Sequence, residues 1–402
     1  MKVLIVTNHF KPESFRINDV AFVLAQKGYE VKVLTSIPDY PQGKFYDGYS
    51  LFKKRTEKVD GVTIVRVPVI PKGNGKKMRM VLNYMSTVFF FTLYGLYQAL
   101  FGRFDCVFVH DTSPAFIIIP ALIVKKIQRI PMYLWILDMW PESLVAGGIH
   151  SKTIYGMVER MMGCFYRNSK KILISSSGFR RMLTAKGVAD EKVVYLPNWC
   201  DEAVISCSHS EIPELPEGFK IMFAGNYGEA QNLTNVFKAA KMTREHKHIQ
   251  WLFVGDGRKK RWADQFVSEN DLADTVHQYG RYPIETMSSF FEQADIMLLP
   301  LCNQLVFNMT LPAKIQAYMA IGKPIMGIIN GEGADVIRKS ECGWCVDADD
   351  YEDLARKVIE ISSMSREELA RLGANGHEYY KKNFTKDSCI GRIERIITDK
   401  DV

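Results

Sequence analysis

The sequence has 402 residues, of which 47% are hydrophobic and 24% are charged, with 28 glycines and 16 prolines. This length predicts two or three folded domains, and the composition excludes a disordered, collagen-like or disulfide-stapled chain. The formal net charge of +7 is too small to indicate a protein that binds nucleic acid.

The first half of the chain alternates short apolar runs with amphipathic stretches. Residues 1–10 (MKVLIVTNHF) contain an apolar run too short for a signal peptide, so they predict a buried strand. A helix is expected over 18–27, ending at Gly28. The other strands predicted in this half are 31–35, 62–67, 106–110, 132–137, 171–175 and 193–196. The alternation predicts βαβ units and a mainly parallel sheet.

The same pattern restarts after a polar, proline-containing linker over 201–218. Strands are predicted over 220–224, 249–254, 276–279, 296–300, 324–329 and 343–346. Helices are predicted over 232–241, 284–293, 313–320, 351–362, 366–382 and 387–400. The sequence therefore predicts an α/β protein with two Rossmann-like domains, each built on a parallel sheet.

We place the N-terminal domain at 1–200 and the C-terminal domain at 219–380. Residues 381–402 are expected to form a C-terminal helix that can return to the N-terminal domain. Because open α/β sheets bind ligands beyond the carboxyl ends of their strands, two facing sheets predict a cleft between the domains. Such a cleft suits a reaction between two substrates, one held by each half.

Residues 80–102 (MVLNYMSTVFFFTLYGLYQALFG) carry no charge and are long enough to span a bilayer. Three interpretations remain open, namely a transmembrane helix, a buried helix covering the sheet, and an amphipathic helix in the cytoplasmic leaflet. Lys76, Lys77 and Arg79 precede the segment and Arg103 follows it. A second basic flank adds charge to the same half, and it contains Lys53, Lys54, Arg55 and Lys58. Residues 1–196 hold 28 Lys and Arg against 14 Asp and Glu. We expect region 76–103 to attach the basic N-terminal domain to a membrane surface.

Polar side chains follow two strands of the N-terminal half. Residues 8–16 (NHFKPESFR) follow the first strand and include Glu13 and Arg16. Residues 136–142 (ILDMWPE) lie at the end of another strand and include Asp138. Both segments lie where a parallel sheet binds ligands, so we treat them as candidate site residues.

The segment 223–232 (FAGNYGEAQN) joins a strand to a helix in the C-terminal half. Gly225 and Gly228 allow the backbone to approach a ligand closely. The following helix offers amide N–H groups and a positive dipole end, which together suit a phosphate. The glycine spacing matches neither the dinucleotide fingerprint nor the P-loop.

The segment 309–324 (MTLPAKIQAYMAIGKP) predicts a helix that Thr310 caps and that has Pro312 in its first turn. Lys314 then also lies in the first turn, where the helix dipole disfavours a cation. An anionic ligand would explain a lysine at this position.

Cys342 and Cys345 form a C-x-x-C pair. A zinc site would need a second pair at suitable spacing, and a redox motif would begin a helix. Because the sequence offers neither, we expect a turn that enters a strand. The scattered cysteines are typical of a protein from a reducing cytosol.

Six segments together, in order along nearly the whole chain, resemble glycosyltransferase family 4. They are HFKPESFRINDVAFVLAQKGYEVKVLT, PDYPQGKFYDGY, LDMWPESL, FAGNYGEAQNL, VGDG and LPAKIQAYMAIGKPI. Members of this family are retaining sugar transferases with the two-domain GT-B fold. The resemblance is closest to bacterial enzymes of O-antigen, capsule and exopolysaccharide assembly, including the L-fucosamine transferase type.

The resemblance implies a UDP-sugar donor in the C-terminal half and a polyprenyl-diphosphate-linked saccharide acceptor in the N-terminal half. It implies no metal and no other cofactor. The donor residues that it implies are Gly225, Asn226, Gly228 and Gln231 near the diphosphate or sugar, Thr310, Leu311, Ala313 and Lys314 at the diphosphate, and Arg281 and Tyr282 beside the base. The expected location is cytoplasmic, at the inner face of the cell membrane, and the expected sugar is an N-acetylated or deoxy amino sugar.

The sequence departs from the family pattern at positions that bind the donor. Asn226 and Gln231 stand where many members have Arg and Lys. Support for the leaving diphosphate then rests more on Lys314, with Arg16 or Arg281 as further cations.

Other departures affect the ribose and the acceptor side. Met309 and Ala317 stand near the positions of a glutamate pair, and Ala317 cannot bind the ribose. Glu332 is our candidate for that contact. Leu137 precedes Asp138 where many members have a histidine.

The sequence shows no carboxylate placed as a nucleophile, which favours front-face attack by the acceptor hydroxyl. We expect Lys314 to stabilise the departing charge, Asp138 to order the donor sugar or acceptor, and Glu13 to assist the acceptor hydroxyl. Two other functions remain open. One is a nucleotide-sugar 2-epimerase of the same architecture, and the other is a non-catalytic, membrane-associated assembly factor.

Overall fold

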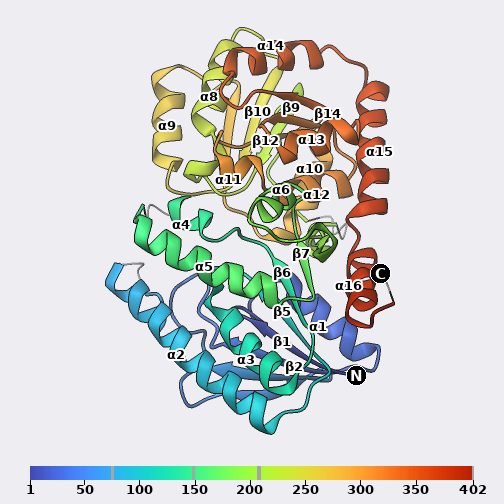
Figure 1. Cartoon of the computed structure of the whole chain (residues 1–402). Coiled ribbons are helices and arrows are strands. Elements are labelled where there is room, and N and C mark those ends of the chain that lie inside the picture. The colour runs from blue at the N-terminus through green and yellow to red at the C-terminus, as the bar shows by residue number, and fades with distance from the viewer. Residues whose placement is uncertain (74–76, 147–149, 206–209, 401–402) are drawn as a thin grey trace. The chain divides into compact units, whose positions relative to one another are not determined.

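A computed structural model describes residues 1–73, 77–146, 150–205 and 210–400. These residues divide into two compact units, which are coloured along the chain in Figure 1. The first unit contains Met1–Ser175, Phe179–Leu196 and Ile390–Val402, and the second contains Ser176–Gly178 and Pro197–Cys389.

The first unit is built on an eight-stranded sheet with the strand order β3-β4-β2-β1-β5-β6-β7-β8. The strands are β1 (Lys2–Thr7), β2 (Glu30–Ser36), β3 (Thr56–Val59), β4 (Val62–Val67), β5 (Cys106–Asp111), β6 (Met132–Ile136), β7 (Lys171–Ile174) and β8 (Val193–Tyr195). All neighbours are parallel except β3 and β4. The central strands β1, β5 and β6 are buried almost throughout, as expected for a parallel sheet covered on both faces.

Helices connect these strands. They are α1 (Arg16–Gln26), α2 (Lys77–Phe101), α3 (Ile118–Gln128), α4 (Glu142–Ala146), α5 (Lys152–Asn168) and α6 (Gly178–Ala185). The C-terminal helix α16 (Lys386–Ile397) returns to this unit, because Glu394 accepts hydrogen bonds from Lys27 Nζ at 2.5 Å and from the hydroxyl of Tyr29 at 3.0 Å.

The second unit contains a six-stranded, fully parallel sheet with the order β11-β10-β9-β12-β13-β14. The strands are β9 (Phe219–Ala224), β10 (Ile249–Val254), β11 (Val276–Gly280), β12 (Ile296–Pro300), β13 (Ile325–Ile328) and β14 (Gly343–Val346). The helices are α7 (Glu202–Ile205), α8 (Leu233–Met242), α9 (Lys260–Glu269), α10 (Met287–Gln293), α11 (Leu305–Asn308), α12 (Ala313–Ala320), α13 (Glu332–Lys339), α14 (Tyr351–Ile361) and α15 (Arg366–Asn383). Two apolar clusters, one containing Met222 and Leu252 and the other Ile221 and Trp251, form its core.

The predicted α/β class with two parallel-sheet domains is confirmed. The predicted linker over 201–218 is not wholly irregular, since it contains the short helix α7. The edge strand β3 was not predicted, because its sequence TEKV is polar and lacks an apolar run. The predicted helix over 284–293 divides into a 3₁₀ turn, Ile284–Thr286, and α10.

Candidate active site

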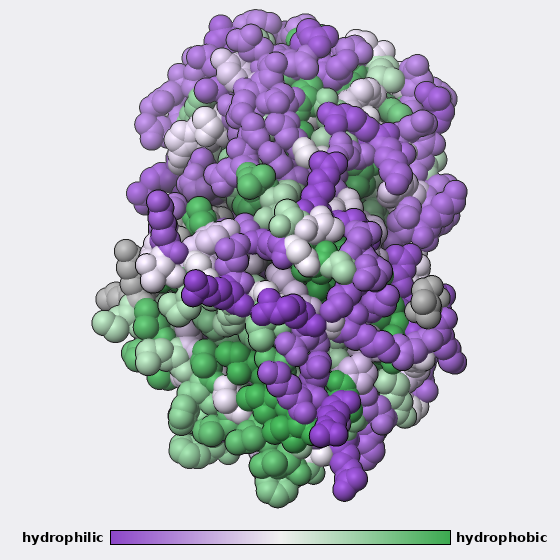
Figure 2. Space-filling model, viewed as in Figure 1, coloured by the Kyte–Doolittle hydropathy of each residue, from purple (hydrophilic) through white to green (hydrophobic). Residues whose placement is uncertain are grey.

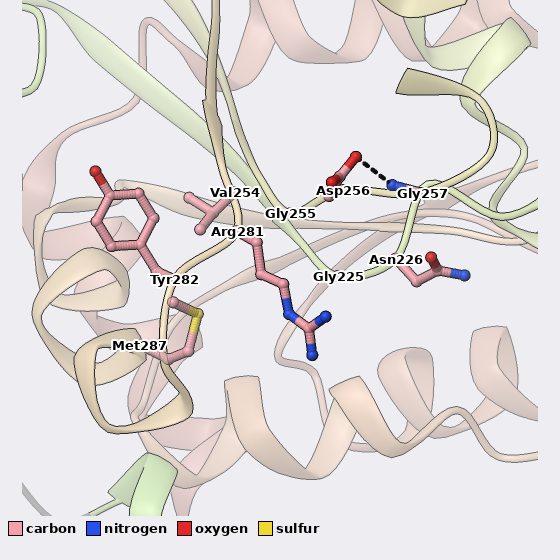
Figure 3. Close-up of a pocket in the computed structure, with 9 residues that line it drawn as sticks. All are labelled: Gly225, Asn226, Val254, Gly255, Asp256, Gly257, Arg281, Tyr282 and Met287. Atoms are coloured by element: carbon pink, nitrogen blue, oxygen red, sulfur yellow. Dashed lines mark hydrogen bonds between the residues drawn. The ribbon is translucent and has the colours of Figure 1, made fainter. Parts of the chain in front are cut away.

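A pocket of about 430 Å³ lies in the second unit, beyond the carboxyl ends of β9, β10 and β11. Figure 3 shows its lining, which consists of Gly225, Asn226, Val254, Gly255, Asp256, Gly257, Arg281, Tyr282 and Met287. Parallel sheets of this kind bind their ligands at this edge. The structure therefore brings together four predicted donor residues, Gly225, Asn226, Arg281 and Tyr282.

The floor of the pocket is backbone rather than side chain. A Cβ atom added at Gly255 would lie 1.9 Å from the carbonyl oxygen of Gly225. The amide of Gly225 donates to Val254 at 2.9 Å, and the amide of Gly255 donates to Gly280 at 2.7 Å. The loops after β9, β10 and β11 are thus held within hydrogen-bonding distance of each other, and a ligand in the pocket meets peptide groups.

Lys314 lies against the Gly225 wall of this pocket. It is the second residue of α12, close to the positive end of the helix dipole. Its Nζ atom donates to Oε1 of Gln231 at 2.5 Å and lies 3.9 Å from the centre of the Phe223 ring. Among the described residues, no carboxylate forms an ion pair with it.

Desolvation lowers the pKa of Lys314 from its ordinary value of 10.5 to about 7. In the free protein, the loss of hydration of the Lys314 ammonium group is therefore poorly compensated by other interactions. The group lies beside the start of α12 and the backbone peptide groups of the pocket. A bound anion would stabilise this ammonium, so the arrangement is suited to a phosphate or diphosphate group.

One prediction about this helix is wrong. Thr310 does not cap α12, because its hydroxyl donates to the carbonyl oxygen of Val306 at 2.7 Å. The residue at the N-cap position is Pro312, which makes no side-chain cap. Because the first amides of α12 have no side-chain cap, they are available to a ligand. Of the other predicted residues here, Leu311 is buried and Ala313 is exposed.

Glu332 begins α13 and is largely buried. The hydroxyl of Ser177 lies 2.7 and 2.6 Å from the two carboxylate oxygens and shares its single hydrogen between them, and the amide of Ser177 donates to Oε1 at 3.2 Å. Ser177 belongs to the short segment 176–178 that groups with the second unit. The carboxylate is therefore already bonded, and a ribose would have to share or replace the serine hydroxyl.

In the first unit, Asp138 follows β6 and is partly exposed. Its Oδ2 atom accepts a hydrogen bond from the hydroxyl of Ser113 at 3.0 Å, and that hydroxyl accepts from Nε1 of Trp140 at 3.1 Å. This chain of hydrogen bonds fixes the orientation of the carboxylate. Trp140 belongs to the candidate segment 136–142, whereas Ser113 was not among the predicted site residues.

Glu13 is buried and fully engaged by hydrogen bonds. Its Oε1 atom accepts from the amides of Asp39 and Tyr40, at 2.9 and 2.6 Å, and its Oε2 atom lies 2.9 Å from Nδ1 of His9. The glutamate therefore orients His9 and the loop at Asp39 instead of presenting a free carboxylate. Arg16 begins α1, a short distance along the chain.

The same cluster is the candidate for a metal site. His9, Glu13 and Asp39 each offer a potential ligand atom within 4.8 Å of the others. Both oxygens of Glu13 are already used, and Oδ2 of Asp39 accepts from the amide of Lys72 at 3.2 Å. Hydrogen bonding alone accounts for this cluster.

The sequence analysis missed the loop Gly255–Gly257, although VGDG was one of the motifs that carried the family resemblance. It also missed Asp111 at the end of β5, which is fully buried. Burial, together with the charge of Asp138, raises the pKa of Asp111 well above its ordinary value. The position of Asp111 one strand away from Asp138 could have identified it, because the two strands end at the same edge.

Two family models match the chain and together cover most of it. Residues 15–199 match the glycosyl transferase 4-like domain, and residues 208–379 match glycosyl transferases group 1. The two matches correspond closely to the two units of the structure.

Curated proteins with similar sequences include bacterial glycosyltransferases. The chain is 23% identical over 327 residues to the probable glycosyltransferase WbjE of Pseudomonas aeruginosa, covering 79% of this chain and 80% of that protein. It is 25% identical over 342 residues to the putative colanic acid biosynthesis glycosyl transferase WcaI of Escherichia coli strain K12, covering 80% and 82%.

Solved structures with the same fold include the sucrose-phosphate synthase of Thermosynechococcus elongatus. Its TM-score is 0.71 at 15% identity, with all of both chains covered. Anabaena Alr3699/HepE in complex with UDP gives a TM-score of 0.69 at 12% identity, covering 99% of this chain and 100% of that one. These matches confirm the predicted GT-B fold.

Proposed function

This chain is a glycosyltransferase, built from a glycosyl transferase 4-like domain followed by a glycosyl transferases group 1 domain, and we propose that it uses a UDP-sugar as donor. The observation that carries the proposal is the position of Lys314. This desolvated lysine has no carboxylate partner among the described residues, and it lies at the start of α12 beside the glycine-lined pocket. The solved relative with bound UDP supports the same choice of donor.

We place the donor in the pocket in the following orientation. The diphosphate lies against Lys314 and the first amides of α12, with Gly225 and Gln231 beside it. The base lies toward Arg281 and Tyr282, which line the other side of the pocket. Glu332 binds the ribose by exchanging the hydroxyl of Ser177 for a ribose hydroxyl.

The reaction retains the configuration of the sugar. The acceptor hydroxyl forms a bond to the anomeric carbon on the face from which the diphosphate leaves. The electron pair of the broken C–O bond passes to the diphosphate, and the proton of the hydroxyl passes to a phosphate oxygen. Lys314 and the amides of α12 stabilise the developing negative charge, and no metal is needed.

The acceptor side belongs to the first unit. Asp138 holds a sugar hydroxyl of the donor or the acceptor, and its orientation is set by Ser113. Glu13 acts through His9, whose imidazole it orients, and so supports binding of the acceptor. Arg16 supplies a further cation for an anionic substrate.

The acceptor that we propose is a polyprenyl-diphosphate-linked saccharide at the inner face of the cell membrane, in the assembly of a surface polysaccharide. Three of the relatives are named for colanic acid biosynthesis, which supports this class. The transferred sugar is an N-acetylated or deoxy amino sugar, as in transferases of the L-fucosamine type.

A panel of nucleotide sugars in a thermal-shift assay, followed by transfer to a short lipid diphosphate saccharide, tests this function. We expect a UDP-sugar to stabilise the protein and a product that keeps the anomeric configuration, at the same rate with or without EDTA. Recovery of a 2-epimer of the donor would instead indicate an epimerase. Absence of both transfer and donor hydrolysis would indicate an assembly factor.

A further inference from the structure

The helix α2 has the reverse of the polarity expected for a helix of a soluble domain, in which the apolar stripe faces the core. Four polar side chains of α2 are buried against the protein, namely Asn83, Ser86, Thr87 and Gln98. Phe91 is the large apolar side chain of α2 that is fully buried. Many of the others point outward, and each of the following is at least 40% exposed: Met78, Val81, Leu82, Met85, Phe89, Leu93, Leu96, Tyr97, Leu100 and Phe101.

Specific contacts fix which face of α2 is turned inward. Nδ2 of Asn83 donates to the carbonyl oxygen of Ile70 at 2.6 Å, and the hydroxyl of Ser86 accepts from the amide of Ile70 at 2.9 Å. A Cβ atom at Gly95 would lie 2.4 Å from Cβ of Pro120, so α2 and α3 are in close contact there. The helix cannot turn its apolar stripe inward without losing these contacts.

The exposed stripe is part of a larger apolar surface. Figure 2 shows hydrophobic residues gathered over the part of the first unit where Figure 1 places α2 and α3. The loop 50–55 is tied to α2, because Arg55 donates to the hydroxyl of Tyr94 at 2.7 Å. This loop carries Phe52, which is 93% exposed. A continuous apolar surface of this kind marks an interaction site.

Several exposed cations lie along this surface. Lys53 and Lys54 are exposed beside Phe52, Arg103 follows α2, and Lys126 and Arg129 lie at the end of α3. The sequences of α2 and α3 contain no Asp and no Glu. An apolar stripe bordered by cations is complementary to an anionic lipid surface, where acyl chains lie beneath negatively charged head groups.

We propose that α2 lies flat in the interface of an anionic bilayer, with its exposed stripe among the acyl chains and the neighbouring cations at the head groups. The helix does not span the bilayer, because its inner face is bound to the protein along its length. The proposal rests on the proposed function, since it gives the enzyme access to a lipid-linked acceptor. It assigns the attachment to α2 and the loop 50–55 of the first unit.

Sedimentation of the full-length protein with vesicles tests the proposal. We expect binding to phosphatidylglycerol vesicles at low salt, and weaker binding to phosphatidylcholine vesicles or at high salt. The double variant Phe89→Asp and Leu93→Asp should bind phosphatidylglycerol at least about tenfold more weakly. Met242→Asp is the matched control, because Met242 is also half exposed but lies on α8 of the second unit, and it should bind like the wild type.

The proposal would be overturned if the wild type failed to bind phosphatidylglycerol vesicles or if the double variant bound them unchanged. It would also be overturned by a solution dimer that the double variant dissociates. Retention in cell membranes after alkaline carbonate extraction would also contradict it, by indicating a spanning helix. UDP binding in solution separates the two proposals, because it tests the donor site alone and should be equal in wild type and double variant.

Discussion

Lys314 packs so closely against Gly225 that a Cβ atom on the glycine would lie 2.7 Å from both Cε and Nζ of the lysine. The glycine therefore provides the space that the ammonium group occupies. Because Gln231 and Phe223 hold the same ammonium on other sides, its position is defined before any ligand binds. Such preorganisation places a charge where negative charge develops in the reaction.

Replacing Lys314 by Ala should remove most of the catalytic activity while the fold persists. We expect turnover to fall by about 10²-fold or more, the loss typical of removing one preorganised charge-stabilising group. The melting temperature should change little, because the wild-type lysine is itself poorly solvated. The control is Lys238→Ala, since Lys238 is an exposed lysine of the same unit. Near-normal turnover of a folded Lys314→Ala enzyme would exclude the proposed role.

Comparing Gly225→Ala with a second glycine variant should show whether turnover depends on the position of the Lys314 ammonium group or only on backbone strain. Gly225 has φ of +150°, and its new methyl group would displace the end of the flexible Lys314 side chain. We expect turnover to fall by about tenfold or more, with a stability cost of about 1 kcal/mol. Gly322→Ala is the matched control, because Gly322 has φ of +72° but its Cβ would meet nothing closer than 3.7 Å. It should lose similar stability and keep its activity; equal activity losses in both variants would refute the explanation.

Binding of UDP should weaken as the pH rises from 7 to 9. Desolvation lowers the pKa of Lys314 to about 7 in the free protein, so the lysine is increasingly neutral above this pH. The bound diphosphate favours the ammonium form, and the complex therefore takes up a proton. We expect affinity to fall by up to about tenfold per pH unit.

Calorimetry in buffers of different ionisation enthalpy measures this proton uptake directly. The variant Lys314→Ala should bind UDP more weakly and with almost no pH dependence over this range. A wild-type affinity that stays constant from pH 7 to pH 9 would mean that Lys314 does not change its protonation on binding.

Asp138→Asn should reduce turnover by about 10–100-fold, because it keeps the size of the side chain but removes the charge that orders a sugar hydroxyl. Ser113→Ala should cause a smaller loss, since it removes only the hydrogen bond that orients the carboxylate. Circular dichroism and steady-state kinetics of both variants check the order of the two effects. If Ser113→Ala lowers turnover more than Asp138→Asn does, Asp138 stabilises the structure of the loop instead of binding the substrate.

Much of this architecture could be predicted from local sequence. The strands β1, β5 and β10 each contain a short unbroken apolar run, and such runs depend little on what lies far away in the chain. Lys314 could be identified because a lysine in the first turn of a helix is unfavourable without a ligand. These signals lie within a few residues of each other.

Other features depend on contacts between distant segments. The sequence predicts an uncharged apolar segment at α2. Only the packing of Ile70 and Pro120 against the helix decides which of its faces is exposed. The bonding of Glu13 depends on the amides of Asp39 and Tyr40, which lie 26 and 27 residues along the chain. No periodicity of the sequence reports such a contact.

Asp111 provides the last prediction, on stability. Its carboxyl group is fully buried, and neither oxygen has a hydrogen-bond partner in the described part of the chain. Burial raises its pKa well above the ordinary value of 3.8, so the folded protein keeps the proton to a higher pH than the unfolded chain does. Between these two pKa values the unfolded state binds fewer protons, and the free energy of unfolding therefore decreases as the pH rises.

Asp111→Asn removes this titration and keeps the shape of the side chain. We expect the variant to match the wild type near pH 4 and to be more stable at pH 8, by at least about 1 kcal/mol. Thermal unfolding at several pH values measures the difference, with the exposed Asp47→Asn as control because water solvates Asp47 in both states. If the difference in the free energy of unfolding between Asp111→Asn and the wild type stays constant with pH, the carboxyl group is ionised in the folded protein. It must then be solvated or paired.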